Sequence, residues 1–297
     1  MPEVNAEVKK RVLEAAMAAE QDCSADLNVP MLAEIAGMSD KHFQLTFASI
    51  LGEAPKSYVR RIRLQYAAYY LVWSDASILQ IAQSYGFLTN AGFTKAFRQQ
   101  YGMSPARFRQ NKSVMPYLRT PGLQGKEDLD SLISNGLAVR IEEVPDQRVA
   151  LVRHIGPTSQ ITKPWRTLLG WARKRKLIFK STEFFGIHND YWDEPSSDRY
   201  RYDAAMTIPA NFRSDNLVST KVLCGGLVAA LEFRGTYKEA ELVWKRFVDQ
   251  WLPVSGYKFR KPYAYDRYPF SLVNQSLPGI LKASLGQISA TFCIPIE

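Results

Sequence analysis

Ser39 and Thr89 are hydroxyl residues that each stand directly before a stretch of helix-forming sequence. A side-chain oxygen at such a position can accept a hydrogen bond from the unpaired N–H groups of a first helical turn, so both residues predict the start of a helix. In both stretches two phenylalanines follow four residues apart, which places them on one face of the helix. The opposite face is left for contact with a partner.

The two helix starts belong to a repeat with an offset of 49 to 50 residues. Each copy reads as a short apolar helix, a turn at glycine, a second helix and a glycine that ends it, followed by a proline that opens the next helix. This order is the helix-turn-helix layout, in which the second helix enters the major groove of DNA. The alternative is a helical bundle whose repeat is only structural. The aligned pairs are Leu32-Ala33 and Ile81-Ala82, Gly37 and Gly86, Gly52 and Gly102, Pro55 and Pro105, and Tyr58 and Phe108.

The chain between the copies, residues 56–71, is rich in helix formers and predicts a rigid spacer. Two helix-turn-helix motifs joined by one rigid spacer could bind successive major-groove faces roughly 34 Å apart. Residues 56–112 carry nine basic residues and one acidic residue, whereas residues 1–55 carry four basic and nine acidic residues. A basic segment neutralises phosphates, so we expect salt-dependent DNA binding to which the second copy contributes most.

The second copy also carries a longer motif, which resembles the DNA-binding domain of AraC/XylS-type transcription regulators. The resemblance covers roughly residues 7–112 and rests on Gly86-Phe87, Phe93, Phe97, Gly102-Met103-Ser104-Pro105 and Phe108-Arg109. It implies an all-α domain with two helix-turn-helix motifs that binds promoter DNA and contacts RNA polymerase. The DNA-binding residues that it implies are Ser39, Lys41, Gln44, Leu45, Thr89, Asn90, Ala91, Gly92, Lys95 and Arg98.

The chain departs from that family at the residues that would face the bases. Leu45 stands where members commonly hold an arginine, and leucine can only touch a thymine methyl group or pack. Lys95 keeps the charge of the usual arginine but loses its bidentate fork. Ala91 and Gly92 shorten the reach of the second helix. We therefore expect a DNA site unlike that of the best-known members.

The composition changes after residue 112. Residues 113–137 are polar and interrupted by proline and glycine, which predicts a linker, with a short helix at 127–134. Residues 138–297 predict an α+β domain. The expected strands lie near 139–142, 148–152, 183–188, 200–208, 217–223, 226–234, 263–268 and 287–294, and the expected helices near 160–175 and 237–252. The expected organisation is therefore a DNA-binding domain at 1–112, a linker at 113–137 and a second domain at 138–297.

The second domain contains its own repeat, with an offset of 79 residues. Each copy reads as a strand that ends in glycine, followed by a helix that carries a tryptophan. Duplicated strand-helix-strand halves are expected to pack about a pseudo-two-fold axis and to leave a groove, which is a common place for a ligand. The aligned pairs are Val149-Ala150 and Val228-Ala229, Gly156 and Gly235, and Trp165 and Trp244.

Several motifs of this domain resemble the GyrI-like effector-binding domain. They are Phe185-Gly186, the acidic and aromatic stretch 189–193, Arg234-Gly235-Thr236-Tyr237, the stretch 263–269 and Phe292-Cys293-Ile294-Pro295-Ile296. Members commonly bind hydrophobic, often cationic, small molecules in an aromatic groove with an acidic residue. By position that residue is Asp266, in place of a usual glutamate, while Thr291 replaces a second one, which weakens the case for a cationic ligand. The aromatic residues expected near the groove are Trp165, Tyr191, Trp192, Trp244 and Tyr268.

An AraC-type DNA-binding domain joined to a GyrI-like domain resembles the Rob-type regulators. We expect a promoter-binding activator, of the multidrug or stress-response kind, modulated by a small hydrophobic effector and active as a monomer or weak dimer. An enzyme with Asp266 as the general base, and a protein that only sequesters drugs, are the alternatives.

The remaining sequence features set bounds on this expectation. With three scattered cysteines, no long apolar run and no signal pattern, the 297-residue chain is expected to be cytoplasmic, nucleoid-associated and without a membrane partner. The three histidines lack metal-ligand spacing, and no cofactor or metal is expected. The run Arg173-Lys174-Arg175-Lys176 is expected to be a solvated helix end.

Overall fold

The computed structural model describes residues 5–21, 27–110, 137–190, 198–212, 215, 217–260, 263–268 and 288–297. The chain divides into two compact units, Met1–Val114 and Met115–Glu297. The first unit is helical and the second is α+β, as the sequence predicts. The linker expected at 113–137 and its short helix lie almost entirely outside the described residues, and the domain limits at 112 and 138 stay a prediction.

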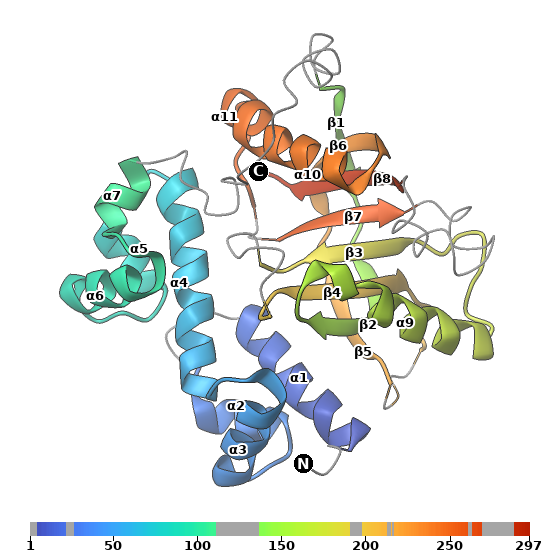
Figure 1. Cartoon of the computed structure of the whole chain (residues 1–297), viewed down its shortest axis with the longest axis horizontal. Helices are drawn as coiled ribbons and strands as arrows, with labels where there is room; N and C mark the ends of the chain where they lie inside the picture. The colour runs from blue at the N-terminus through green and yellow to red at the C-terminus, as the bar shows by residue number, and fades with distance from the viewer. Residues whose placement is uncertain are drawn as a thin grey trace. The chain divides into compact units, whose positions relative to one another are not determined.

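The helical unit consists, in its described part, of two groups of short helices joined by one long helix (Figure 1). The long helix α4 begins at a proline, as expected, and forms the spacer that residues 56–71 predict. The bounds are α1 (Ala6–Gln21), α2 (Val29–Ile35), α3 (Asp40–Leu51), α4 (Pro55–Trp73), α5 (Ile78–Ser84), α6 (Asn90–Tyr101) and α7 (Pro105–Gln110).

Glycines place the turns of the repeat at equivalent points. Gly37 and Gly86 follow α2 and α5 with φ angles of 61° and 76°. Gly52 and Gly102 cap the C-terminal ends of α3 and α6 with φ angles of 73° and 71°. This left-handed conformation costs glycine little because it has no Cβ atom. The repeat in sequence is therefore a repeat of backbone geometry.

The aromatic side chains of the two copies also pack in the same way. The rings of Phe47 and Tyr58 lie 5.3 Å apart at an angle of 78°. In the second copy the rings of Phe97 and Phe108 lie 5.2 Å apart at 81°. Each pair joins the second helix of its copy to the helix that follows, and each is buried. An apolar face of α3 and of α6 is thereby fixed inward, which turns the opposite face of each helix to solvent.

The described strands of the α+β unit form one eight-stranded antiparallel sheet in the order β1-β6-β8-β7-β3-β4-β2-β5. Their bounds are β1 (Val139–Val144), β2 (Gln147–Ile155), β3 (Phe184–His188), β4 (Arg201–Thr207), β5 (Ser219–Leu223), β6 (Gly226–Gly235), β7 (Ala264–Tyr268) and β8 (Ile288–Pro295). The helices are α9 (Thr162–Lys174), α10 (Tyr237–Arg246) and α11 (Leu252–Val254), with a 3₁₀ turn at Thr158–Gln160 and a π-helical turn at Phe247–Trp251. The predicted strands and helices of this unit are confirmed.

The sheet order reads the same from both ends once the two halves of the repeat are exchanged. β2, α9, β3 and β4 of the first half correspond to β6, α10, β7 and β8 of the second. The strand that opens each half crosses over, because β1 pairs with β6 and β5 pairs with β2. The halves meet where β3 pairs with β7, and there Gly186 lies directly opposite Asp266. The symmetric sheet order makes this pair the centre of the repeat, where Gly186 and Asp266 correspond to each other with an offset of 80 residues, one more than the 79 seen at β2, β6 and the two helices.

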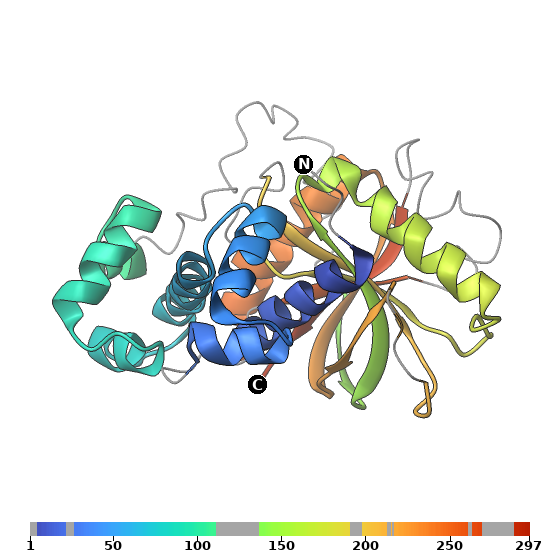
Figure 2. The ribbon, with the colours of Figure 1, turned by 90° about the horizontal axis from the view of Figure 1, so that it is seen from below.

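The helices α9 and α10 lie on the same face of this sheet, one over each half (Figures 1 and 2). The indole N–H of Trp165 on α9 donates to the hydroxyl of Tyr202 on β4 over 2.9 Å. The indole N–H of Trp244 on α10 donates to Asp266 on β7 over 3.2 Å. Tyr202 and Asp266 therefore both point to the helix-covered face, close to the junction of the halves.

A buried ion cluster stabilises the opposite face of the first half. Asp203 is fully buried and accepts hydrogen bonds from Lys221 over 2.8 Å, from Arg153 and from Asn189. Burial alone would raise the pKa of this carboxyl group, but Arg153 and Lys221 outweigh burial and hold that pKa well below its usual range. Since Arg153 and Lys221 lie on β2 and β5, the cluster ties these strands to β4.

We predict that Gly186→Ala destabilises the α+β unit. A Cβ atom at this position would lie 2.2 Å from the hydroxyl oxygen of Tyr202, so the ring would have to move. The expected loss of unfolding free energy is about 1–3 kcal/mol, measured by urea denaturation. Gly170→Ala on α9 is the control, because a Cβ atom there meets nothing within 4 Å and alanine favours a helix. Equal stability of the two variants would contradict this account.

Candidate functional site

The ten residues expected to contact DNA are all exposed. They lie at the start and along the outward face of α3 and α6, opposite the buried phenylalanines. Leu45 is 66% exposed, although it is apolar and lies in the middle of α3. An exposed leucine at this place has no packing role in the helical unit. It is therefore available to a partner surface.

The two helix starts differ in capping. The Thr89 hydroxyl accepts a hydrogen bond from the N–H of Gly92 over 3.1 Å, as predicted. Ser39 occupies the equivalent position, but its side chain makes no such bond, so the predicted cap is wrong for the first copy. Asp40 in the first turn of α3 instead favours the positive end of the helix dipole. That carboxylate also makes the start of α3 less suited to a phosphate than the start of α6, whose first turn has no acidic residue.

Several cations counted in the sequence as phosphate contacts are engaged inside the helical unit. Arg61 forms an ion pair with Glu53 at 2.7 Å. Arg63 donates to the carbonyl oxygen of Leu27, and Arg109 donates to the carbonyl oxygens of Leu71 and Ala76. The remaining described cations of residues 56–112 are exposed, namely Lys56, Arg60, Lys95, Arg98 and Arg107. The positive surface is thus smaller than the charge count indicates.

In the α+β unit Asp266 is the centre of a polar cluster at the junction of the halves. Its Oδ2 atom lies 3.0 Å from Nε2 of His188 and accepts a hydrogen bond from the Tyr268 hydroxyl over 3.1 Å. Its Oδ1 atom accepts the bond from the indole of Trp244. The carboxylate is 9% exposed and is therefore held almost out of water by three partners. We name His188, Trp244, Asp266 and Tyr268 the Asp266 cluster.

The aromatic residues predicted for the groove fall into two layers. Trp244 is half-buried and stacks on Phe292 with ring centroids 4.8 Å apart. Trp165 is fully buried, and its ring meets that of Tyr268 edge-on at 5.5 Å. Trp165 thus supports the cluster from behind. Tyr191 and Trp192 lie outside the described residues.

Thr291, which replaces a second acidic residue of the family, does not lie beside Asp266. Thr291 pairs with Arg267, whereas Asp266 pairs with Phe292. Because successive residues of a strand point to opposite faces, Thr291 lies on the face opposite Asp266. Its lack of charge therefore says nothing direct about the charge around Asp266.

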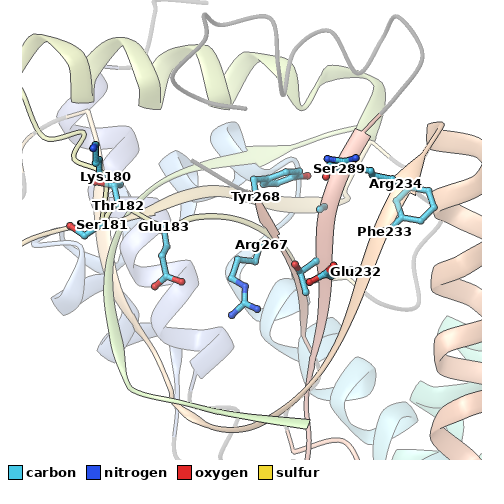
Figure 3. Close-up of a pocket in the computed structure, with 12 residues that line it drawn as sticks. Lys180, Ser181, Thr182, Glu183, Glu232, Phe233, Arg234, Arg267, Tyr268 and Ser289 are labelled. Atoms are coloured by element: carbon cyan, nitrogen blue, oxygen red, sulfur yellow. The ribbon is translucent and has the colours of Figure 1, made fainter. Parts of the chain in front are cut away.

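An open cavity of about 840 Å³ lies beside the cluster at the ends of β6 and β7 and the starts of β3 and β8 (Figure 3). It shares Tyr268 with the Asp266 cluster. Figure 3 shows Glu183 and Arg267 pointing to the same side of the sheet. The lining also includes Lys180, Arg234 and Glu232. Since both signs of charge line it, the cavity gives no preference for a charged ligand.

The described residues contain neither a metal-binding cluster nor a membrane-spanning helix. No group of three His, Cys, Asp or Glu side chains lies close enough together to hold a metal ion. No helix there has the length and apolar character needed to cross a membrane.

Comparisons with known proteins match the helical unit and the α+β unit to two different domain models. A helix-turn-helix domain model matches residues 32–111, and a GyrI-like small molecule binding domain model matches residues 137–270. The probable transcription factor PqrA of Proteus vulgaris is 39% identical over 88 residues, which are 30% of this chain and 72% of that protein. The chain belongs to the AraC family of transcription regulators.

Other transcription regulators match about a third of the chain. The transcriptional regulator Rob of Salmonella typhimurium is 35% identical over 98 residues, 33% of this chain and 34% of Rob. The chain spans 35% of the length of an uncharacterized HTH-type transcriptional regulator of Haemophilus influenzae, also at 35% identity. Among solved structures, the DNA-binding domain of AdpA in complex with a target DNA is 31% identical, with a TM-score of 0.33 over 34% of this chain and 91% of that one.

These findings decide between the classes of function considered from the sequence. The relatives are named as transcription regulators, and both matched models describe binding domains. The chain is therefore a DNA-binding regulator of the AraC family with a GyrI-like small-molecule-binding domain.

Sequence reasoning missed His188 as a member of the cluster. In the sequence no Cys or carboxylate lies at metal-ligand spacing from it, so local spacing gives it no role. The offset of 79 in the sequence aligns His188 with Arg267, and only the register of β3 against β7 shows that His188 corresponds to Tyr268, as Gly186 does to Asp266. Equivalent positions on β3 and β7 thus converge on the same carboxylate oxygen.

We predict that removal of the two helix-start hydroxyls has unequal effects. Thr89→Ala loses a formed cap and is expected to lower the unfolding free energy of the helical unit by about 1 kcal/mol. Ser39→Ala removes no such bond and is expected to change it by less than about 0.5 kcal/mol. Thermal and urea unfolding followed by circular dichroism measure both. A loss for Ser39→Ala as large as that for Thr89→Ala would show that the serine caps α3 in solution.

Proposed function

We propose that this regulator binds promoter DNA through the outward faces of α3 and α6, contacts RNA polymerase and activates transcription, and that an effector at the Asp266 cluster modulates it. The observation that carries the DNA part is the orientation of α6. Phe93 and Phe97 are fully buried on one side, which leaves Asn90, Lys95 and Arg98 exposed on the other.

The two helices are proposed to contribute differently. In α6 the capped N-terminus, Lys95 and Arg98 supply phosphate and base contacts, and Asn90 has the donor and acceptor pair that matches adenine. In α3 the exposed Lys41 and Gln44 can hydrogen-bond base edges, while Leu45 can contact the methyl group of thymine. Asp40 opposes phosphate at the start of α3. We therefore assign most of the affinity to α6.

The effector is proposed to be a small hydrophobic molecule that carries a positive charge. A carboxylate that is 9% exposed, bordered by the rings of Trp244 and Tyr268, offers charge attraction and cation–π contact in one place. Partial removal from water strengthens both interactions. By linkage, an effector that changes DNA affinity must have its own affinity changed by DNA to the same extent.

We predict that Lys95→Ala weakens DNA binding by about fivefold to twentyfold and lowers the slope of log affinity against log salt by about 0.9, because one contact between a cation and a phosphate is lost. Fluorescence anisotropy over a series of salt concentrations, with genomic fragments selected by the wild-type protein, measures both. Lys9→Ala on α1 is the control, since it removes an equal charge at an exposed site away from α6. Equal effects of the two variants would mean that α6 does not read DNA.

We predict that Asp266→Asn weakens binding of the organic cation benzyltrimethylammonium about tenfold, because the side chain keeps its size but loses its charge. Calorimetry on the full chain measures the affinity. Glu232→Gln is the control, because it removes one negative charge from the opposite face of the sheet. Unchanged cation affinity in Asp266→Asn would place the effector elsewhere.

A further inference from the structure

His188 is the more exposed half of the pair that it forms with Asp266. Its side chain is 25% exposed, whereas that of Asp266 is 9% exposed. A molecule that approaches the carboxylate from solvent therefore meets the imidazole as part of the same surface. The charge of the pair, and not of the carboxylate alone, is what such a molecule encounters.

The hydrogen bonds of His188 are complete when its imidazole is neutral. Nε2–H can donate to Oδ2 of Asp266 over 3.0 Å, and Nδ1, 2.8 Å from the Tyr200 hydroxyl, can accept from it. The carboxylate can only accept, so it selects the tautomer with the proton on Nε2. In this state the pair carries one negative charge. Protonation of Nδ1 turns the Tyr200 hydroxyl into an acceptor and brings the charge of the pair to zero.

The groups that face His188 come from three elements besides its own strand. They are Asp266 on β7, Tyr200 directly before β4, Tyr202 on β4 with its ring 5.2 Å away, and the uncharged indole of Trp244 on α10 at 6.4 Å. Two residues along its own chain, Asp190 is engaged in a buried ion pair with Arg201. Among these residue types, histidine is the one whose charge ordinarily changes between about pH 5 and pH 8.

We infer that His188 determines the charge of the ligand that the site accepts. With a neutral imidazole the pair attracts a hydrophobic organic cation. With a protonated imidazole the attraction is cancelled, and the cation is rejected while an uncharged molecule of the same shape still binds. This inference rests on the proposed effector site at Asp266 and adds that proton uptake controls which class of effector occupies it.

Two probes of equal shape test this on the full chain. Benzyltrimethylammonium carries a permanent charge, and neopentylbenzene is its uncharged carbon isostere. We expect the affinity of the wild-type protein for the cation to fall about tenfold or more from about pH 8 to about pH 5. The affinity for neopentylbenzene is expected to change less than about twofold. Isothermal titration calorimetry in buffers of matched ionic strength measures both.

The chain contains three histidines, which makes the assignment direct. His188→Gln keeps hydrogen-bonding capacity but does not titrate, and it is expected to bind the cation equally at both pH values. His154→Gln is the matched control in the same unit, where Nε2 of His154 lies 3.1 Å from the carbonyl oxygen of Pro157, and it should keep the wild-type pH dependence.

The outcomes distinguish the role of His188 from the existence of the effector site. Cation affinity that does not depend on pH in the wild-type protein overturns the role of His188 and leaves the effector site standing. Retention of the full pH dependence in His188→Gln does the same, and this comparison needs only that the variant binds a probe. Failure of both probes to bind the wild-type protein at any pH overturns the effector site itself, and the inference with it.

Discussion

The pairing of β3 with β7 is the central contact of the α+β unit, because the two halves of the repeat meet there in the middle of the sheet. At its centre Gly186 faces Asp266. One of these two equivalent positions has no side chain, and the other has a carboxylate. The missing side chain at residue 186 admits the Tyr202 hydroxyl, which in turn receives the Trp165 indole. The carboxylate at residue 266 receives the Trp244 indole. The first half of the repeat therefore has packed aromatic side chains at this point, and the second half has a charged site.

In the helical unit, too, the two copies of a repeat share a backbone arrangement and differ in their functional side chains. Each copy buries two phenylalanines on one face of its second helix, and the second of them packs against an aromatic ring of the next helix in the same geometry in both copies. The copies differ on the outward face, where α3 carries Asp40 and Leu45, whereas α6 has a capped start without an acidic residue and carries Lys95. Packing constrains the inner face through volume, whereas the outer face is constrained only by what it binds. The two copies are therefore equivalent as scaffolds and unequal as contact surfaces.

Much of this architecture could be predicted from the sequence. Periodicity, caps and glycines predict the helices of the first unit, since these signals are local, and the two repeats predict the symmetry of both units. Charge counts were less informative, because they cannot distinguish an exposed arginine from Arg63 or Arg109, which donate to backbone carbonyl oxygens. The partnership of His188 with Asp266 depends on strand register, and the crossing-over of β1 and β5 depends on sheet order. Neither is written in a local pattern.

The crossed strands have a consequence for the origin of this sheet. β1 completes the edge beside β6, and β5 completes the edge beside β2, so each half finishes the other half's border. The turns that follow these strands meet, with the N–H of Gly225 bonded to Asp146 over 2.6 Å. A half-length chain could not close this arrangement by itself. It would reach the same eight strands only by trading its first strand with a second copy, so the present unit has the form of a strand-swapped dimer within a single chain.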